Sequence, residues 1–275
     1  MKNIFKIHPL TYITILIALI TGNFKNIFIF MTIIFIHEMG HFLTAIILKW
    51  KVTKVVILPF GGITIFNESL NNPLKEEFLI TIMGPIVQIL FTIFMNILNL
   101  KIFNYFSFII LFLNLIPIYP MDGSKILNIF LNKFFPFKLS HSITNYLSLF
   151  LILFLLFLSI FKHELLYIIF SILIIIKLKA EFINHELIYQ KFLYERYLYN
   201  FKFKKFKIIQ DINKFYKDNY HYFKTKKGII DEKQLLNIKY NLWSKYKLFV
   251  NLILNEIIEI DIIFKEGVFN YGKWE

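Results

Sequence analysis

An apolar run from Ile27 to Leu48 carries His37, Glu38 and His41 in a His-Glu-x-x-His pattern. The run is long enough to cross a bilayer as a helix, which takes about 20 residues. Residues four apart share one face of a helix, so both imidazoles can reach one metal ion. Such residues are costly at membrane depth, about 2.5–3.5 kcal/mol each if charged and unpaired. The pattern therefore predicts a membrane-spanning helix with a metal site, and Glu38 as the general base of a metalloprotease.

Composition and the spacing of apolar runs predict an α-helical integral membrane protein. The sequence is 57% hydrophobic and 18% charged, which soluble globular domains rarely approach. Lysines concentrate in alternate loops between the apolar runs, and the positive-inside rule places those loops in the cytoplasm. We therefore expect about six transmembrane helices with both termini cytoplasmic. The segments are Leu10–Gly22, Ile27–Leu48, Phe78–Leu98, Phe103–Tyr119, Ile143–Phe161 and Leu165–Ile176.

Charged residues are sparse before Lys177 and dense after it, which predicts two domains. We expect a transmembrane domain over residues 1–178 and a basic cytoplasmic tail over residues 179–275. An amphipathic helix that runs off the last apolar segment is expected from Leu178 to Arg196, followed by a small α/β module in residues 200–240. The net charge of +13 suits anionic lipid head groups or an acidic partner. No nucleic-acid recognition motif is present, so we expect no nucleic-acid partner.

A hairpin is predicted between the second and third apolar segments. Two β-branched runs within Val52–Phe66 are joined through a proline and the pair Gly61 and Gly62, which favours two strands and a tight turn. One interpretation is a membrane-associated edge that receives an extended substrate by strand addition, with the two glycines holding it. The alternative is an ordinary cytoplasmic hairpin.

A catalytic zinc site usually has three protein ligands and a water, so two histidines are one ligand short. The chain has no cysteine, and the third ligand must then be histidine or carboxylate. Asp122 is the candidate, because Pro117 and Pro120 break the fourth apolar segment just before it. The alternative for Asp122 is a turn residue before Gly123. We expect one zinc ion per chain.

Asn114 lies beside the same proline-rich break. Its amide could hydrogen-bond the substrate or a developing oxyanion. It could equally satisfy backbone groups that the kink sets free.

These motifs together resemble the site-2 protease class of intramembrane zinc metalloproteases, peptidase family M50, and are most similar to its bacterial six-span subgroup, the stage IV sporulation FB type. The resemblance implies zinc on His37, His41 and Asp122, with Glu38 activating the water. At Gln88 the family usually has an asparagine that helps hold substrate. The motifs that carry the resemblance are His37-Glu38-Met39-Gly40-His41, Leu58-Pro59-Phe60-Gly61-Gly62, Gly84-Pro85, Asn114-Leu115-Ile116-Pro117 and Pro120-Met121-Asp122-Gly123.

The resemblance also implies a setting in the cell. It suggests a multi-pass protein of a bacterial membrane that cleaves a membrane-associated regulatory protein near the cytoplasmic leaflet. The substrate would be the precursor of a sporulation sigma factor if the organism sporulates, and otherwise an anti-sigma factor or another membrane-tethered regulator. Inhibitory membrane proteins would be partners. Residues 200–240 are loosely similar to the CBS domain that the subgroup carries after its last span.

Two other function classes use the same residues. A metal transporter could use the histidines and Asp122 as a transit site, but it predicts a polar path through other spans, and the last two segments offer little of one. A catalytically inactive membrane scaffold of the same fold has no need of Glu38. Both alternatives rank below the protease.

Overall fold

The computed structural model describes residues 5–7, 9–58, 61–66, 69–163, 165–211, 213–225 and 228–241. Pro59 and Phe60 of the hairpin motif, and residues 242–275 of the expected tail, lie outside the described residues. The contacts within the chain divide it into two units. The first comprises residues 1–68, 74–117 and 121–129, and the second comprises residues 69–73, 118–120 and 130–275.

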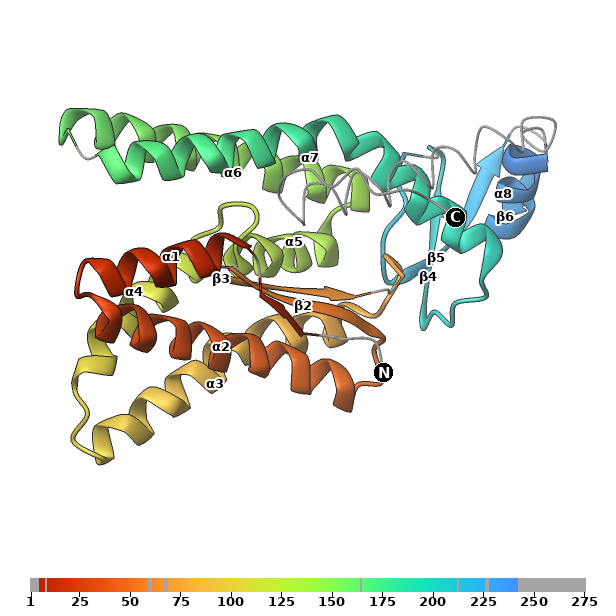
Figure 1. The fold of residues 1–275 in the computed structure, drawn as a ribbon. Coiled ribbons are helices and arrows are strands. Elements are labelled where there is room, and N and C mark those ends of the chain that lie inside the picture. Colours follow the sequence, from red (N-terminus) through yellow and green to blue (C-terminus); the bar gives the residue numbers. More distant parts are fainter. Residues whose placement is uncertain are drawn as a thin grey trace, which may run out of the picture. The chain divides into compact units, whose positions relative to one another are not determined.

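Helices make up most of the first unit (Figure 1). The chain forms α2 and α3 where its apolar runs are longest. Two glutamates in the first turn of α3 stabilise this helix, because negative charge interacts favourably with the positive end of the helix dipole. The helices of this unit are α1 (Pro9–Ile20), α2 (Phe24–Ile47), α3 (Leu74–Ile97), α4 (Ile102–Leu115) and the first turns of α5 (Asp122–Phe134).

The predicted hairpin is present as β2 (Val52–Leu58) and β3 (Gly61–Phe66), which pair antiparallel. The sequence did not predict β1 (Phe5–Ile7), which pairs parallel to β2 on its other side. The strand order β1-β2-β3 leaves β3 at an edge of this sheet, as far as the described residues extend.

Two glycines allow α2 and α3 to cross closely. A Cβ atom on Gly40 would lie 2.9 Å from the Cα of Gly84 and 2.5 Å from the carbonyl oxygen of Met83. Small residues at a crossing let helix backbones approach, and this is how helices commonly pack in membranes. The His-Glu-x-x-His turn of α2 is therefore held directly against the Gly84-Pro85 turn of α3.

In the second unit, α6 (Phe137–Phe161) and α7 (Leu165–Leu198) run side by side (Figure 1). The predicted sixth segment and the predicted amphipathic helix are one continuous helix of 34 residues, so the expected domain boundary at 178 falls inside α7. The predicted small module contains β4 (Lys205–Ile209), β5 (Asn219–Thr225), β6 (Gly228–Asp231) and α8 (Glu232–Asn241).

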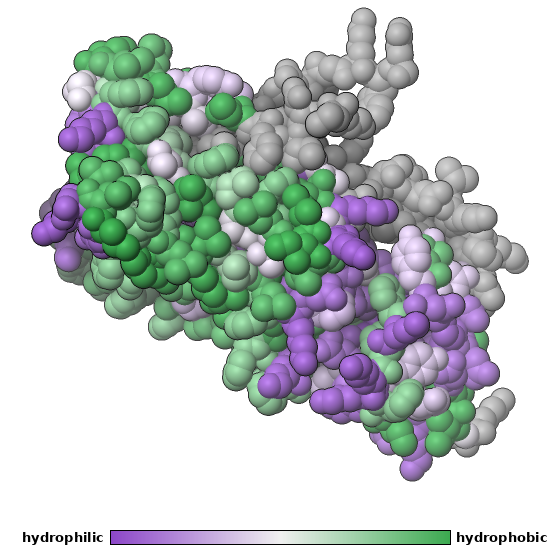
Figure 2. Space-filling view, turned by 90° about the horizontal axis from the view of Figure 1, so that it is seen from below, coloured by the Kyte–Doolittle hydropathy of each residue, from purple (hydrophilic) through white to green (hydrophobic). Residues whose placement is uncertain are grey.

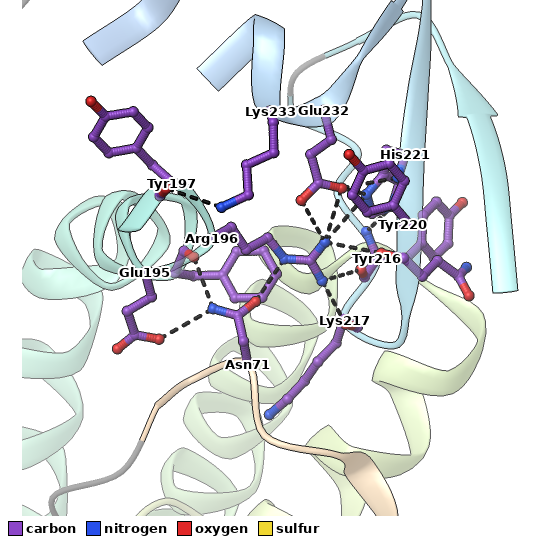
Figure 3. Close-up of polar contacts among 12 residues, drawn as sticks. Asn71, Glu195, Arg196, Tyr197, Tyr216, Lys217, Tyr220, His221, Glu232 and Lys233 are labelled. Carbon is purple, nitrogen blue, oxygen red and sulfur yellow. Dashed lines mark hydrogen bonds and ion pairs between the residues drawn. The ribbon is translucent and has the colours of Figure 1, made fainter. Parts of the chain in front are cut away.

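The module packs around a buried arginine. Arg196 of α7 is 1% exposed and lies among the rings of Phe192, Phe203 and Phe215. Its guanidinium donates to both carboxylate oxygens of Glu232, at 3.1 and 3.2 Å (Figure 3). We call this group, with His221, the Arg196 cluster.

The outer faces of the long helices are apolar. Among the described residues, three helices are long and apolar enough to cross a membrane: α2, α3 and α6. Large side chains such as Phe28, Leu90 and Phe150 are at least 60% exposed, and hydrophobic residues gather into a broad area in Figure 2. So large an exposed apolar surface is typical of lipid contact. Helices α1 and α4 are apolar but shorter.

Candidate metal centre

The structure brings His37, His41 and Asp122 together inside the first unit. All three are buried, with 2%, 6% and 6% of their surface exposed. The Nε2 atoms of the two imidazoles lie 3.1 Å apart, and Asp122 Oδ2 lies 3.0 Å from His37 Nε2 and 3.1 Å from His41 Nε2. Among the described residues, these three form the one group of histidine and acidic side chains arranged to hold a metal ion.

The donor set fits zinc. Bonds of about 2.0–2.1 Å in a tetrahedral site separate neighbouring ligand atoms by roughly 3.3 Å, close to the 3.0–3.1 Å found here. Each histidine also places its Nδ1 against an oxygen acceptor, Gln88 Oε1 for His37 and the Ile80 carbonyl for His41. A neutral imidazole that donates through Nδ1 keeps a lone pair on Nε2. Two lone pairs and a carboxylate oxygen then converge, which favours a bound cation.

The Gly84-Pro85 pair makes room for His41. A Cβ atom on Gly84 would lie 2.3 Å from His41 Nε2, so only glycine leaves space for the ring. Pro85 has no N–H and disturbs the hydrogen-bond ladder of α3 in this turn. In the same stretch, the Ile80 carbonyl accepts a hydrogen bond from His41 Nδ1 at 2.8 Å. Gly84 of this motif is thus explained by the position of a metal ligand.

Asp122 is the first residue of α5, and its two oxygens face different partners. Oδ2 faces the histidines, and Oδ1 accepts from Lys125 Nζ at 2.9 Å. A Cβ on Gly123 would lie 2.2 Å from the Leu115 carbonyl oxygen, so glycine lets α5 begin directly against the end of α4.

Glu38 follows His37 on α2 and is 6% exposed. Its carboxylate interacts electrostatically with His41 and Lys125. A buried carboxylate beside the ligand cluster is in the right region to act as a base.

The other predicted site residues have different surroundings. Gln88 is fully buried and bonded to His37 and to Ser107 of α4. Gly61 and Gly62 open β3, opposite Leu58 and Ile57. Asn114 is half-buried near the end of α4. None of the hydrogen bonds recorded for the described residues joins Asn114, Gly61 or Gly62 to the metal ligands.

Three features of the site were not predicted. Lys125 could have been noticed from its i+3 spacing to Asp122, which allows a pair on one helix face. Ser107 could have been noticed as a polar residue within an apolar segment, where polar groups are rare and usually functional. The Ile80 carbonyl left no signal in the sequence, because every residue has one.

Comparison with known proteins finds similarity to metallopeptidases. Residues 25–102 match the family model described as peptidase family M50. Stage IV sporulation protein FB of Bacillus subtilis (strain 168) is 35% identical over 152 residues, covering 52% of this chain and 53% of that protein. A zinc metalloprotease of Methanocaldococcus jannaschii is 30% identical over 169 residues, covering 53% and 49%. The chain thus spans about half the length of these curated relatives.

The fold also matches a solved structure. A site-2 protease from Methanocaldococcus jannaschii aligns with a TM-score of 0.52 and 23% identity, covering 64% of this chain and 89% of that one. At this identity the match shows a shared fold.

Proposed function

We propose that this chain is a member of peptidase family M50, whose family model matches residues 25–102, and that it is a zinc-dependent intramembrane endopeptidase. The observation that carries the proposal is the convergence of His37 Nε2, His41 Nε2 and Asp122 Oδ2 within 3.1 Å of one another. Two histidines and a carboxylate are a known ligand set of catalytic zinc in peptidases. Two of the three ligands lie on α2, a helix able to span a membrane, so the reaction would occur at membrane depth.

Glu38 is the proposed general base. Zinc bound by the three ligands would supply Lewis-acid polarisation of the scissile carbonyl and would acidify water. Glu38 would accept the proton of the attacking water and return it to the leaving amine. Lys125 would hold Asp122 through Oδ1, so that Oδ2 stays directed toward the histidines.

The edge strand β3 is the proposed docking place for substrate. A helical substrate shields its own amides, so the bond to be cut must first become extended. Strand addition to β3 would supply main-chain hydrogen bonds to an extended segment. Gly61 and Gly62 open this strand, and we propose that they permit close approach. Asn114 remains a candidate for hydrogen bonding to the substrate.

We further propose six spans with both termini in the cytoplasm and cleavage near the cytoplasmic leaflet. The distribution of lysines between apolar segments supports this orientation. The basic tail, residues 179–275, would lie at the cytoplasmic face against anionic lipid, with a CBS-like module in residues 200–240.

The relative in Bacillus subtilis suggests a substrate class. Its name places it in sporulation, and we propose a membrane-associated regulatory protein, such as a sporulation sigma-factor precursor, as substrate. Inhibitory membrane proteins are the proposed partners.

The test is Glu38→Gln in the full chain, coexpressed with a candidate sigma-factor precursor. We expect the variant to retain zinc but to cleave about 10²–10⁴-fold more slowly, the usual contribution of a general base. Glu186→Gln, which alters an exposed acid, should cleave as the wild type does. Precursor size on a gel and zinc content after purification measure both quantities. Equal cleavage by Glu38→Gln would contradict the base assignment, and a zinc-free active wild type would contradict the metal.

A further inference from the structure

Gln88 is enclosed completely in the first unit. It lies near the middle of α3 and is 0% exposed. Its Oε1 lies 2.8 Å from His37 Nδ1, and its Nε2 lies 2.8 Å from the carbonyl oxygen of Ser107 and 3.0 Å from Ser107 Oγ. The amide therefore bridges a metal ligand on α2 to the helix α4.

The partners of the amide fix which way it faces. The Ser107 carbonyl can only accept a hydrogen bond, so the NH₂ group of Gln88 must face it. The amide oxygen then faces His37, and a hydrogen bond between them requires the proton on Nδ1. The reversed amide would place two oxygens together at Ser107. His37 is thus held in the tautomer whose Nε2 lone pair faces Asp122.

Thr92 completes an ordered network around Ser107. Thr92 Oγ1 donates to the backbone carbonyl oxygen of Gln88 at 2.8 Å and lies 2.6 Å from Ser107 Oγ. With the Thr92 hydrogen already used, the Ser107 hydroxyl donates to Thr92 Oγ1. Ser107 Oγ is then free to accept from Gln88 Nε2. Each of these hydrogens has a single acceptor, so the network disfavours a flipped side-chain amide of Gln88.

In both histidines the Nδ1 proton is held by an acceptor, but the acceptors are of different kinds. His41 Nδ1 donates to a backbone carbonyl, that of Ile80, which no side-chain substitution removes. His37 Nδ1 depends on the side chain of Gln88 alone among its recorded partners.

We infer that Gln88 is a positioning residue, which presents His37 Nε2 to the metal, and that Ser107 holds its amide. This inference rests on the proposed zinc site and replaces the expectation that Gln88 binds substrate. Partners of this kind typically change metal affinity about 10–100-fold when lost. The contribution is therefore measurable as zinc binding, independently of cleavage.

The test compares zinc affinity among single variants of the full chain in detergent, by competition with a chromophoric chelator. Gln88→Met keeps length but removes the oxygen, and Gln88→Asn keeps the amide but removes its reach. We expect both to bind zinc about 10–100-fold more weakly than the wild type. Ser107→Ala keeps the carbonyl partner and should change affinity by less than about threefold, below the usual range for loss of an orienting contact.

Kinetics at saturating zinc separate this role from substrate binding. Positioning predicts that added zinc restores much of the activity of Gln88→Met, with KM unchanged. Wild-type zinc affinity in both Gln88→Met and Gln88→Asn, with a raised KM, would overturn the inference and return Gln88 to substrate binding. Failure of the proposed function itself has another signature: the wild type would bind no zinc.

Discussion

The His37–His41–Asp122 cluster of the first unit and the Arg196 cluster of the second both bury histidine against a carboxylate. In the Arg196 cluster the donors and acceptors match. Arg196 donates to Glu232, to the side chain of Asn71 and to backbone carbonyls. His221 donates from Nδ1 to Glu232 at 2.8 Å and accepts at Nε2 from the Tyr216 N–H at 3.0 Å. The positive guanidinium compensates the buried carboxylate, and the cluster is complete without a ligand.

The metal centre lacks this match. Its two Nε2 lone pairs and Asp122 Oδ2 are all acceptors when the histidines are neutral, and they converge at about hydrogen-bond distance. Each neutral histidine has one ring proton, and it lies on Nδ1, where it is donated to Gln88 or to the Ile80 carbonyl. It cannot also be donated to Asp122. A buried cluster of matched groups stabilises a fold, whereas a buried cluster of unmatched acceptors is prepared for a cation. Four substitutions or conditions test this difference.

Asp122→Asn should have the largest effect on function and a small one on folding. It removes a ligand charge where acceptors converge. It also removes the pair with Lys125, but that side chain is 57% exposed and can be solvated, so the metal-free protein should lose little stability. Zinc affinity should fall by more than the roughly 100-fold that marks the upper range for loss of an orienting contact, and cleavage should be lost. Zinc competition and thermal unfolding of the metal-free protein measure both. A large loss of metal-free stability would remove the contrast between the clusters.

Glu232→Gln is the matching charge removal in the second unit. It leaves Arg196 buried without a countercharge, and breaking such a pair costs about 3–5 kcal/mol. Hydrogen exchange of residues 205–241 in the full chain should show this loss, with zinc affinity unchanged. The exposed pair of Glu186 with Lys138 supplies the control, since Glu186→Gln should cost about 0–1 kcal/mol. Equal exchange in both variants would show that the Arg196 cluster is dispensable.

Gly84→Ala should disturb the metal centre without changing any ligand. The added Cβ would lie 2.3 Å from His41 Nε2, so the ring must move. We expect zinc affinity to fall about 10–100-fold, as for loss of an orienting contact. Gly40→Ala separates the same two helices but meets the Met83 carbonyl instead of a ligand, and it should weaken zinc binding less. The reverse order would mean that helix separation, and not His41, controls the site.

Of the four tests, a pH change should have the smallest effect, a loss of stability of the Arg196 cluster at low pH. Burial, opposed by the hydrogen bond to Glu232, lowers the pKa of His221 below its usual value of 6.5. The unfolded chain then binds more protons than the folded one below about pH 6.5. The resulting contribution to the free energy of unfolding is complete above that pH and is lost as the pH falls through the pKa of the folded state.

Protonation of Nε2 would also remove the acceptor for the Tyr216 N–H. Hydrogen exchange of residues 205–241 between pH 7 and 5 should therefore accelerate beyond the intrinsic trend. In His221→Asn, which keeps a donor for Glu232 but has no imidazole, the extra dependence should disappear. Its persistence would assign the effect to another group.

Local pattern was enough for several elements. The 22-residue apolar run gave α2 with its two histidines on one face, and the β-branched runs gave β2 and β3, because both depend on neighbours a few residues apart. Leu165–Ile176 and Leu178–Arg196 were correctly predicted to be helical, and they join into the single helix α7. Strand β1 was missed, since a three-residue segment has no periodicity of its own.

The sequence by itself determined the chemistry available to this protein: two histidines four apart on an apolar helix, a glutamate beside them and no cysteine. Only the tertiary structure decided how that chemistry is assembled. Asp122 reaches His37 from 85 positions away and Gln88 from 51. Gly84 is explained only by the imidazole that lies over it. Residues close in sequence fix secondary structure, whereas a buried site closes through hydrogen bonds between helices, and the packing of those helices sets its geometry.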